Sequence, residues 1–138
     1  MDSKIIEITP PDAQALLDRD PSSRLIDVRS KVEFDYVGHP PGAIHIAWKE
    51  FPDWKENPAF VEYVEATLVR EQLVGPDTPL LMLCRSGARS NSAGLKLIAA
   101  GYSRVYNVLE GFEGDKDENQ HRGNLNGWRF RGLAWQQG

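Results

Sequence analysis

The only cysteine of the 138-residue chain, Cys84, lies at the end of an apolar run within the stretch LLMLCRSGARSNSAGLKLIAAG, residues 80–101. Two arginines, Arg85 and Arg89, and several small residues follow it directly. A cysteine with a purely structural role needs none of these neighbours, because a buried thiol packs as a small apolar group. The arrangement therefore predicts that Cys84 is a nucleophile.

The loop that follows Cys84 has the composition of an anion-binding loop. Its residues are small or cationic: Arg85, Ser86, Gly87, Ala88, Arg89 and Ser90. The glycine permits tight curvature and the small side chains leave the interior open, so that backbone N–H groups of residues 85–89 can converge on one point. The N-terminus of a following helix and the two arginine side chains add positive charge. These effects favour the thiolate form of Cys84 and attract an anionic substrate, while the two serine hydroxyls are candidates for hydrogen bonds at the loop edges.

Short apolar runs alternate with helical patterns along most of the chain. Four runs have the length of buried strands: 24–28, 43–46, 79–83 and 104–109. Helices are predicted from Pro10 with Thr9 as N-cap, from Asn57 to about 73, and from about 88 to 100. The alternation indicates βαβ units and a parallel sheet. Cys84 then lies at the carboxyl end of a strand, where ligands bind in open α/β sheets.

The composition is that of an ordinary globular domain, with 41% hydrophobic and 26% charged residues. The net charge of -4 gives no general affinity for nucleic acid or anionic membranes, so any anion site must be local. A lone cysteine excludes an internal disulfide and a multi-cysteine zinc site. We find neither a signal-peptide pattern nor a membrane-spanning stretch. These features predict one soluble, cytoplasmic domain over residues 1–138.

Asp27 and Arg29 flank the end of a predicted strand, and Glu33 follows four residues after Arg29. We interpret these residues as a structural ion pair and turn that fix the sheet edge; a catalytic part for Asp27 is the less favoured alternative. His39 is expected to form a hydrogen bond within its Gly-His-Pro turn. The three histidines are too scattered in sequence for a metal site, so neither a metal nor a cofactor is expected.

The tryptophans are predicted to have packing roles. Trp48, Phe51 and Trp54 recur at helix-like intervals and are expected in the core or at the rim of the site. Trp128 and Trp135 lie in a polar, glycine-containing C-terminal segment and are expected to hold it against the domain. A partner-binding surface is the weaker interpretation of these two residues.

Three motifs, in this order, resemble those of the rhodanese-like family of sulfurtransferases. They are LIDVR at 25–29 followed by Glu33 and Phe34, GHPPGAIHI at 38–46, and the loop CRSGARS at 84–90. The resemblance covers about residues 5–112 and leaves 113–138 as an irregular extension. Two departures are Pro40, where isoleucine or valine is frequent, and GFEG at 111–114, where many members have a glycine pair.

The resemblance implies an α/β fold with an open five-stranded parallel sheet, flanked by helices on both faces. It also implies a persulfide mechanism. The Cys84 thiolate attacks the outer sulfur of a donor such as thiosulfate, and the persulfide then passes its sulfur to a thiol, cyanide or protein acceptor. The backbone amides of the loop stabilise the donor anion and the persulfide, and Arg85 and Arg89 attract the donor.

Loop length separates the alternatives within this fold. From Cys84 the sixth residue is Arg89 and the seventh is Ser90. Sulfurtransferases of the family use a six-residue loop, whereas the related phosphatases use a seven-residue loop that ends in arginine. The serine therefore disfavours a phosphatase or arsenate reductase. Arg85 favours thiosulfate or a protein persulfide over mercaptopyruvate as the donor. A non-catalytic binding module, the remaining alternative, is disfavoured because such modules often lack the cysteine.

Overall fold

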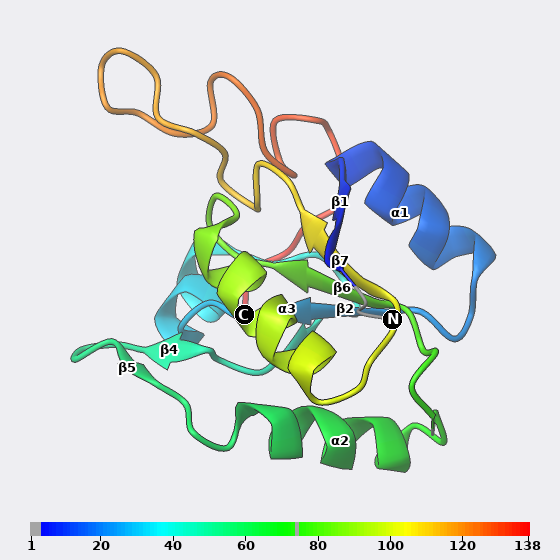
Figure 1. Ribbon diagram of the computed structural model, residues 1–138. Helices are drawn as coiled ribbons and strands as arrows, with labels where there is room; N and C mark the ends of the chain where they lie inside the picture. Colours follow the sequence, from blue (N-terminus) through cyan, green and yellow to red (C-terminus); the bar gives the residue numbers. More distant parts are fainter. Residues whose placement is uncertain (1–3, 74) are drawn as a thin grey trace.

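The computed structural model describes residues 4–73 and 75–138, and its centre is a five-stranded, all-parallel sheet (Figure 1). The order across the sheet is β1-β7-β6-β2-β3. The strands are β1 (Ile6–Ile8), β2 (Arg24–Asp27), β3 (Ile44–His45), β6 (Leu80–Leu83) and β7 (Val105–Val108). Strand β6, which ends just before Cys84, is therefore central, with β7 and β2 as its neighbours.

Helices cover both faces of the sheet. They are α1 (Pro10–Arg19), α2 (Phe60–Arg70) and α3 (Ala88–Ala99). The apolar sides of α2 and α3 pack on one face, against Leu80 and Met82 of β6. Helix α1 packs on the other face, against Leu81 and Leu83. All four residues of β6 are buried, as expected for a strand covered on both sides. The predicted fold class is confirmed.

The C-terminal segment packs on the same face of the sheet as α1 and covers the part of it that α1 leaves open. After β7 the chain runs without a further helix or named strand through its described residues to Gly138. The fully buried side chains of Phe112 and Trp128 join the apolar cluster beneath α1, and Trp128 Nε1 donates to the carbonyl of Ala134 at 2.9 Å. The segment thus contributes Phe112 and Trp128 to the core.

Several element boundaries differ from the sequence prediction. Strand β1 was not predicted from the residue pattern; it is short, and it forms by pairing with β7 at the other end of the chain. Helix α2 begins at Phe60 rather than Asn57, because Asn57 closes a preceding turn in which its Oδ1 accepts from the Ala59 amide at 3.0 Å. Thr9 caps α1 as predicted.

The helix-like spacing of aromatic residues does not correspond to a helix. Residues 49–56 form an antiparallel hairpin from β4 (Lys49–Glu50) and β5 (Lys55–Glu56). Trp48 precedes the hairpin and packs edge-on against Phe60 in the core. Phe51 and Trp54 lie exposed at its tip. Among the described residues, no helix is both long and apolar enough to cross a membrane.

The burial of Trp128 predicts that it stabilises the whole domain. Trp128→Ala is expected to lower the free energy of unfolding by about 3–5 kcal/mol, because it leaves a large cavity under α1. Urea denaturation followed by circular dichroism measures this change. Trp135→Ala is the matched control, since the Trp135 side chain is 44% exposed. Equal losses in the two variants would contradict the packing role of Trp128.

Candidate active site

Cys84 lies directly after β6, and the loop that follows folds back over its sulfur. The Cys84 side chain is only 1% exposed. The backbone N–H of Gly87 donates to Cys84 Sγ at 3.1 Å, and Ser90 Oγ lies 3.2 Å from the same sulfur. The Gly87 amide is therefore in place to stabilise negative charge on sulfur, and the Ser90 hydroxyl lies within hydrogen-bonding distance of it.

The position of the Gly87 amide depends on a backbone conformation that glycine favours. Gly87 has φ 120° and ψ -10° and is the N-cap of α3, which begins at Ala88. An L-residue in this conformation is strained. The helix N-terminus thus starts beside the sulfur, and its partial positive charge favours an anion there.

Asn107 is a buried polar residue of the site that the sequence analysis did not identify. It lies on β7, where its Oδ1 accepts from Ser90 Oγ at 2.5 Å and its Nδ2 donates to the Gly87 carbonyl at 3.2 Å. The Ser90 hydroxyl has a single proton, and the short bond directs that proton to Asn107. Ser90 Oγ then presents a lone pair to Sγ, which suits a thiol; donating to a thiolate requires the hydroxyl to rotate.

The side chain of Arg89 is turned to the side and forms an ion pair with Glu33. Its Nη1 and Nη2 contact the two carboxylate oxygens at 2.7 and 2.8 Å. Ser30 Oγ donates to the same carboxylate at 2.9 Å. Partial burial raises the pKa of Glu33, but the hydrogen bonds and charge of Arg89, together with Ser30, outweigh burial and lower this pKa from 4.5 to about 2.

This pair corrects two expectations. Arg89 was expected to attract the donor, yet its charge is matched by a carboxylate, so the exposed Arg85 is the loop arginine without an ion pair among the described residues. Glu33 was grouped with Asp27 and Arg29, but its partner is Arg89. Asp27 and Arg29 form a separate, fully buried pair, with Arg29 Nη2 2.6 Å from Asp27 Oδ2.

His39 joins the turn before β3 to Phe34 and to the C-terminal segment. Its Nδ1 lies 2.8 Å from the carbonyl of Phe34, outside the Gly-His-Pro turn to which its hydrogen bond was assigned, and its ring stacks on that of Phe34 at 3.7 Å. Its backbone pairs with Gln136 of the C-terminal segment. Within the described parts of the chain, no group of three or more His, Cys, Asp or Glu side chains could hold a metal ion.

The C-terminal segment also braces the active-site loop from behind. The amide of Phe112 donates to the Cys84 carbonyl at 2.8 Å, and the amides of Glu113 and Gly114 donate to the Arg85 carbonyl at 3.0 and 3.2 Å. A Cβ on Gly111 would lie 2.4 Å from the Arg85 carbonyl carbon, so only glycine permits this approach. The carbonyls of Cys84 and Arg85 are thereby satisfied, and the loop is held in place while the Gly87 amide donates to the sulfur.

With this geometry in place, comparison with known proteins assigns the family. A family model described as a rhodanese-like domain matches residues 9–118. The chain therefore belongs to the rhodanese-like family. A thiosulfate sulfurtransferase GlpE from Haemophilus influenzae is 29% identical over 108 residues, which cover 78% of this chain and 85% of the relative. GlpE from Pseudomonas syringae is 34% identical over 107 residues, covering 77% and 82% of the two chains.

A solved structure gives a match over the whole length. The crystal structure of Rv0390 from M. tuberculosis superposes with a TM-score of 0.83 at 35% identity, and the alignment covers 99% of this chain and 100% of the other. The C-terminal segment is included in that match, in agreement with its place in the core.

Neutralising Glu33 is expected to destabilise the protein in a pH-dependent way. The pKa of Glu33 is lowered from 4.5 to about 2 on folding. The contribution of Glu33 to the free energy of unfolding is therefore complete above about pH 4.5 and is lost as pH falls towards 2. Glu33→Gln should lower the free energy of unfolding by about 1–3 kcal/mol at pH 7 and by less than half of that at pH 3. Urea titrations at both pH values, with Glu62→Gln as an exposed control, measure the change. A difference that does not depend on pH would contradict the pairing.

Replacing Gly87 is expected to weaken the stabilisation of the sulfur anion. In Gly87→Ala the strained conformation relaxes and moves the amide away from Sγ, and alkylation of Cys84 by iodoacetamide at pH 7 should slow about tenfold. Gly75→Ala is the matched control, because Gly75 has φ 119° and nothing within 4 Å of an added Cβ. Equal alkylation rates in the two variants would exclude the role assigned to the Gly87 amide.

Proposed function

We propose that the protein transfers sulfane sulfur from thiosulfate, or from a similar anionic donor, through a persulfide on Cys84. The observation that carries the proposal is a lone thiol at the carboxyl end of the central strand, with the Gly87 amide and the Ser90 hydroxyl within hydrogen-bonding distance of its sulfur. The GlpE relatives, whose named activity is thiosulfate sulfurtransfer, support it.

In the first half-reaction the Cys84 thiolate attacks the outer sulfur of thiosulfate. The new S–S bond forms as the bond to the sulfonate sulfur breaks, and sulfite leaves with the electron pair of that bond. Arg85, exposed beside the thiol, attracts the dianionic donor. The Gly87 amide stabilises the charge that stays on the persulfide.

In the second half-reaction an external nucleophile attacks the outer persulfide sulfur. The S–S bond breaks, its electron pair returns to Sγ, and the thiolate is regenerated. Cyanide, a small thiol and a protein thiol are all chemically competent acceptors. One cysteine suffices because the acceptor supplies the second nucleophile.

The position of Ser90 bears on phosphatase chemistry. It is the seventh residue counted from Cys84, where the related phosphatases carry arginine, and its Oγ lies 3.2 Å from Sγ. The loop therefore lacks the side chain that would hold a transferring phosphoryl group. This supports the sulfurtransferase proposal over the phosphatase alternative.

Intact-protein mass spectrometry after incubation with thiosulfate tests the proposal. The wild type should gain the mass of one sulfur atom, release it on addition of cyanide, and form thiocyanate. Cys84→Ala should show none of these changes and should remain folded, because the thiol is a small part of the core. If neither thiosulfate nor a persulfide-bearing protein loads the wild type, the proposal is wrong. Hydrolysis of an aryl phosphate would then revive the phosphatase alternative.

A further inference from the structure

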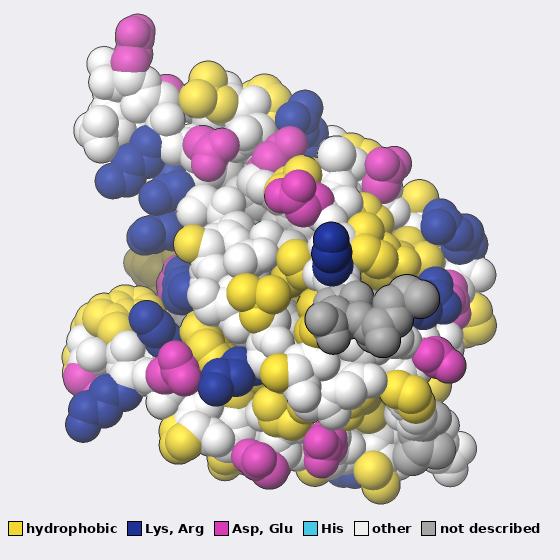
Figure 2. All heavy atoms as spheres, viewed as in Figure 1, with side chains coloured by type: hydrophobic (Ala, Val, Ile, Leu, Met, Phe, Trp, Pro, Cys, Tyr) yellow, Lys and Arg dark blue, Asp and Glu magenta, His cyan; other side chains and the backbone are white. Residues whose placement is uncertain are grey.

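Two projecting segments lie on either side of the loop that follows β6 (Figure 1). One is the hairpin of residues 49–56, and the other, which we call the tail arm, comprises residues 115–126. Figure 2 shows a hollow between these two projections, with Lys and Arg side chains along its sides. The hollow leads to the loop that contains Arg85.

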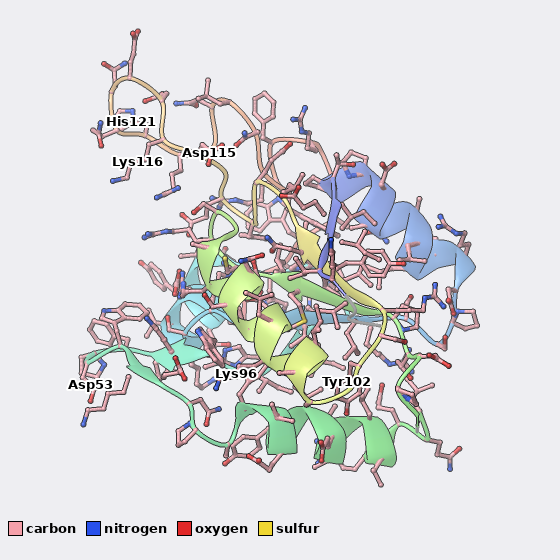
Figure 3. All side chains as sticks on the ribbon, viewed as in Figure 1. Asp53, Lys96, Tyr102, Asp115, Lys116 and His121 are labelled. Atoms are coloured by element: carbon pink, nitrogen blue, oxygen red, sulfur yellow. The ribbon has the colours of Figure 1, made fainter. Side chains whose placement is uncertain are left out.

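The tail arm brings cationic side chains to this hollow. Gly114, at the base of the arm, donates its amide to the Arg85 carbonyl at 3.2 Å and accepts from Arg122 Nη1 at 2.6 Å. Arg85 and Arg122 therefore both contact Gly114. Lys116 follows Gly114 by two positions in the sequence and lies on the arm (Figure 3). In the part of the chain that the structure describes, none of these three cations has a carboxylate within 4.0 Å.

Neighbouring carboxylates of the arm are used to hold its shape. Asp117 accepts from the backbone amides of Asn119 and His121, both at 2.9 Å, and from Asn124 Nδ2 at 2.8 Å. Asp115 Oδ2 accepts from the side-chain amide of Asn126 at 3.0 Å. These bonds preorganise the arm, so the arm loses little conformational entropy when a ligand binds to it. On the side that faces the hollow, Figure 2 shows Lys and Arg side chains, so these are the charges that a ligand there meets first.

The opposite side of the hollow offers aromatic surface. Phe51 and Trp54 at the hairpin tip are 56% and 43% exposed, and their rings meet edge-on at 6.0 Å. The Trp54 ring also lies 5.5 Å from Arg89 Cζ, which places the hairpin tip beside the active-site loop. Exposed aromatic side chains next to a charged rim are the residues that anchor protein interfaces.

We propose that this hollow binds the sulfur acceptor, and that the acceptor is a protein whose reactive thiol lies in an acidic segment. This inference rests on the proposed sulfurtransferase function and names its partner class. In a chain of net charge -4, three clustered cations without ion pairs select an anionic partner. A protein is favoured over RNA because the exposed aromatic side chains of the hairpin offer apolar contact of the kind found at protein interfaces.

Two synthetic peptides of equal length test the proposal. Each has one central cysteine, which is flanked by glutamates in one peptide and by lysines in the other. With Cys84 loaded by thiosulfate, we expect the glutamate peptide to take up sulfur about tenfold faster at limiting concentration. The preference should shrink as salt rises. It should be lost in Lys116→Glu/Arg122→Glu, while transfer to cyanide by this variant stays within about twofold of the wild type.

The matched control is Arg19→Glu/Arg104→Glu, which changes the net charge equally at the amino-terminal ends of the strands, away from the Cys84 loop, and should keep the preference. Equal rates with both peptides, or a loss of preference in the control as well, would overturn the proposal. So would displacement of the glutamate peptide by an RNA oligonucleotide that binds more tightly.

A serine version of the glutamate peptide separates this inference from the proposed function. Its binding is measured by the change in intrinsic tryptophan fluorescence that is lost in Trp54→Phe, and it needs no sulfur transfer. If Cys84 does not load but the peptide binds the wild type and not Lys116→Glu/Arg122→Glu, the persulfide proposal fails and the docking surface stands. If Cys84 loads and this peptide does not bind, the docking proposal fails alone.

Discussion

The buried guanidinium of Arg29 is the interaction around which the site is assembled. Its Nε and Nη2 contact Asp27 at 2.9 and 2.6 Å, and Nη2 also donates to the Gly38 carbonyl at 2.6 Å. The ring of Phe112 lies 4.4 Å from its Cζ. One side chain therefore joins the end of β2, the turn before β3 and the C-terminal segment. An uncompensated charge at this depth costs several kcal/mol, so these segments must keep their relative positions.

The two ion pairs of the site have different consequences because they differ in burial. The Arg29 pair is fully buried and holds the framework. The pair of Glu33 and Arg89 is partly exposed and neutralises one of the two loop arginines. Positive charge at Cys84 then comes mainly from the start of α3, the Gly87 amide and Arg85. A donor anion can reach Arg85 without breaking an ion pair, which keeps the energetic cost of binding low.

The parts of the site that are contiguous in sequence were predictable. An apolar run, Cys84, a glycine loop and a helix start follow one another, and local rules suffice to place them. The proline start of α1 was predicted for the same reason. Residues brought together by pairing across the chain were not predictable: β1 forms only against β7, and Asn107 reads as one polar residue in a strand until it meets Ser90. The Glu33–Arg89 pair joins positions 56 residues apart, and charge counting along the sequence favoured the nearer Arg29.

The near-complete burial of Cys84 sets an order of events in the proposed reaction. At 1% exposure, Cys84 presents almost no surface to a thiol held on a folded protein. Loading places a second sulfur about 2 Å beyond the first. A bulky acceptor thus gains an accessible sulfur only after the small donor has reacted and its sulfite has gone. In the proposed reaction, burial of the Cys84 sulfur therefore places loading by the small donor before contact with a bulky acceptor.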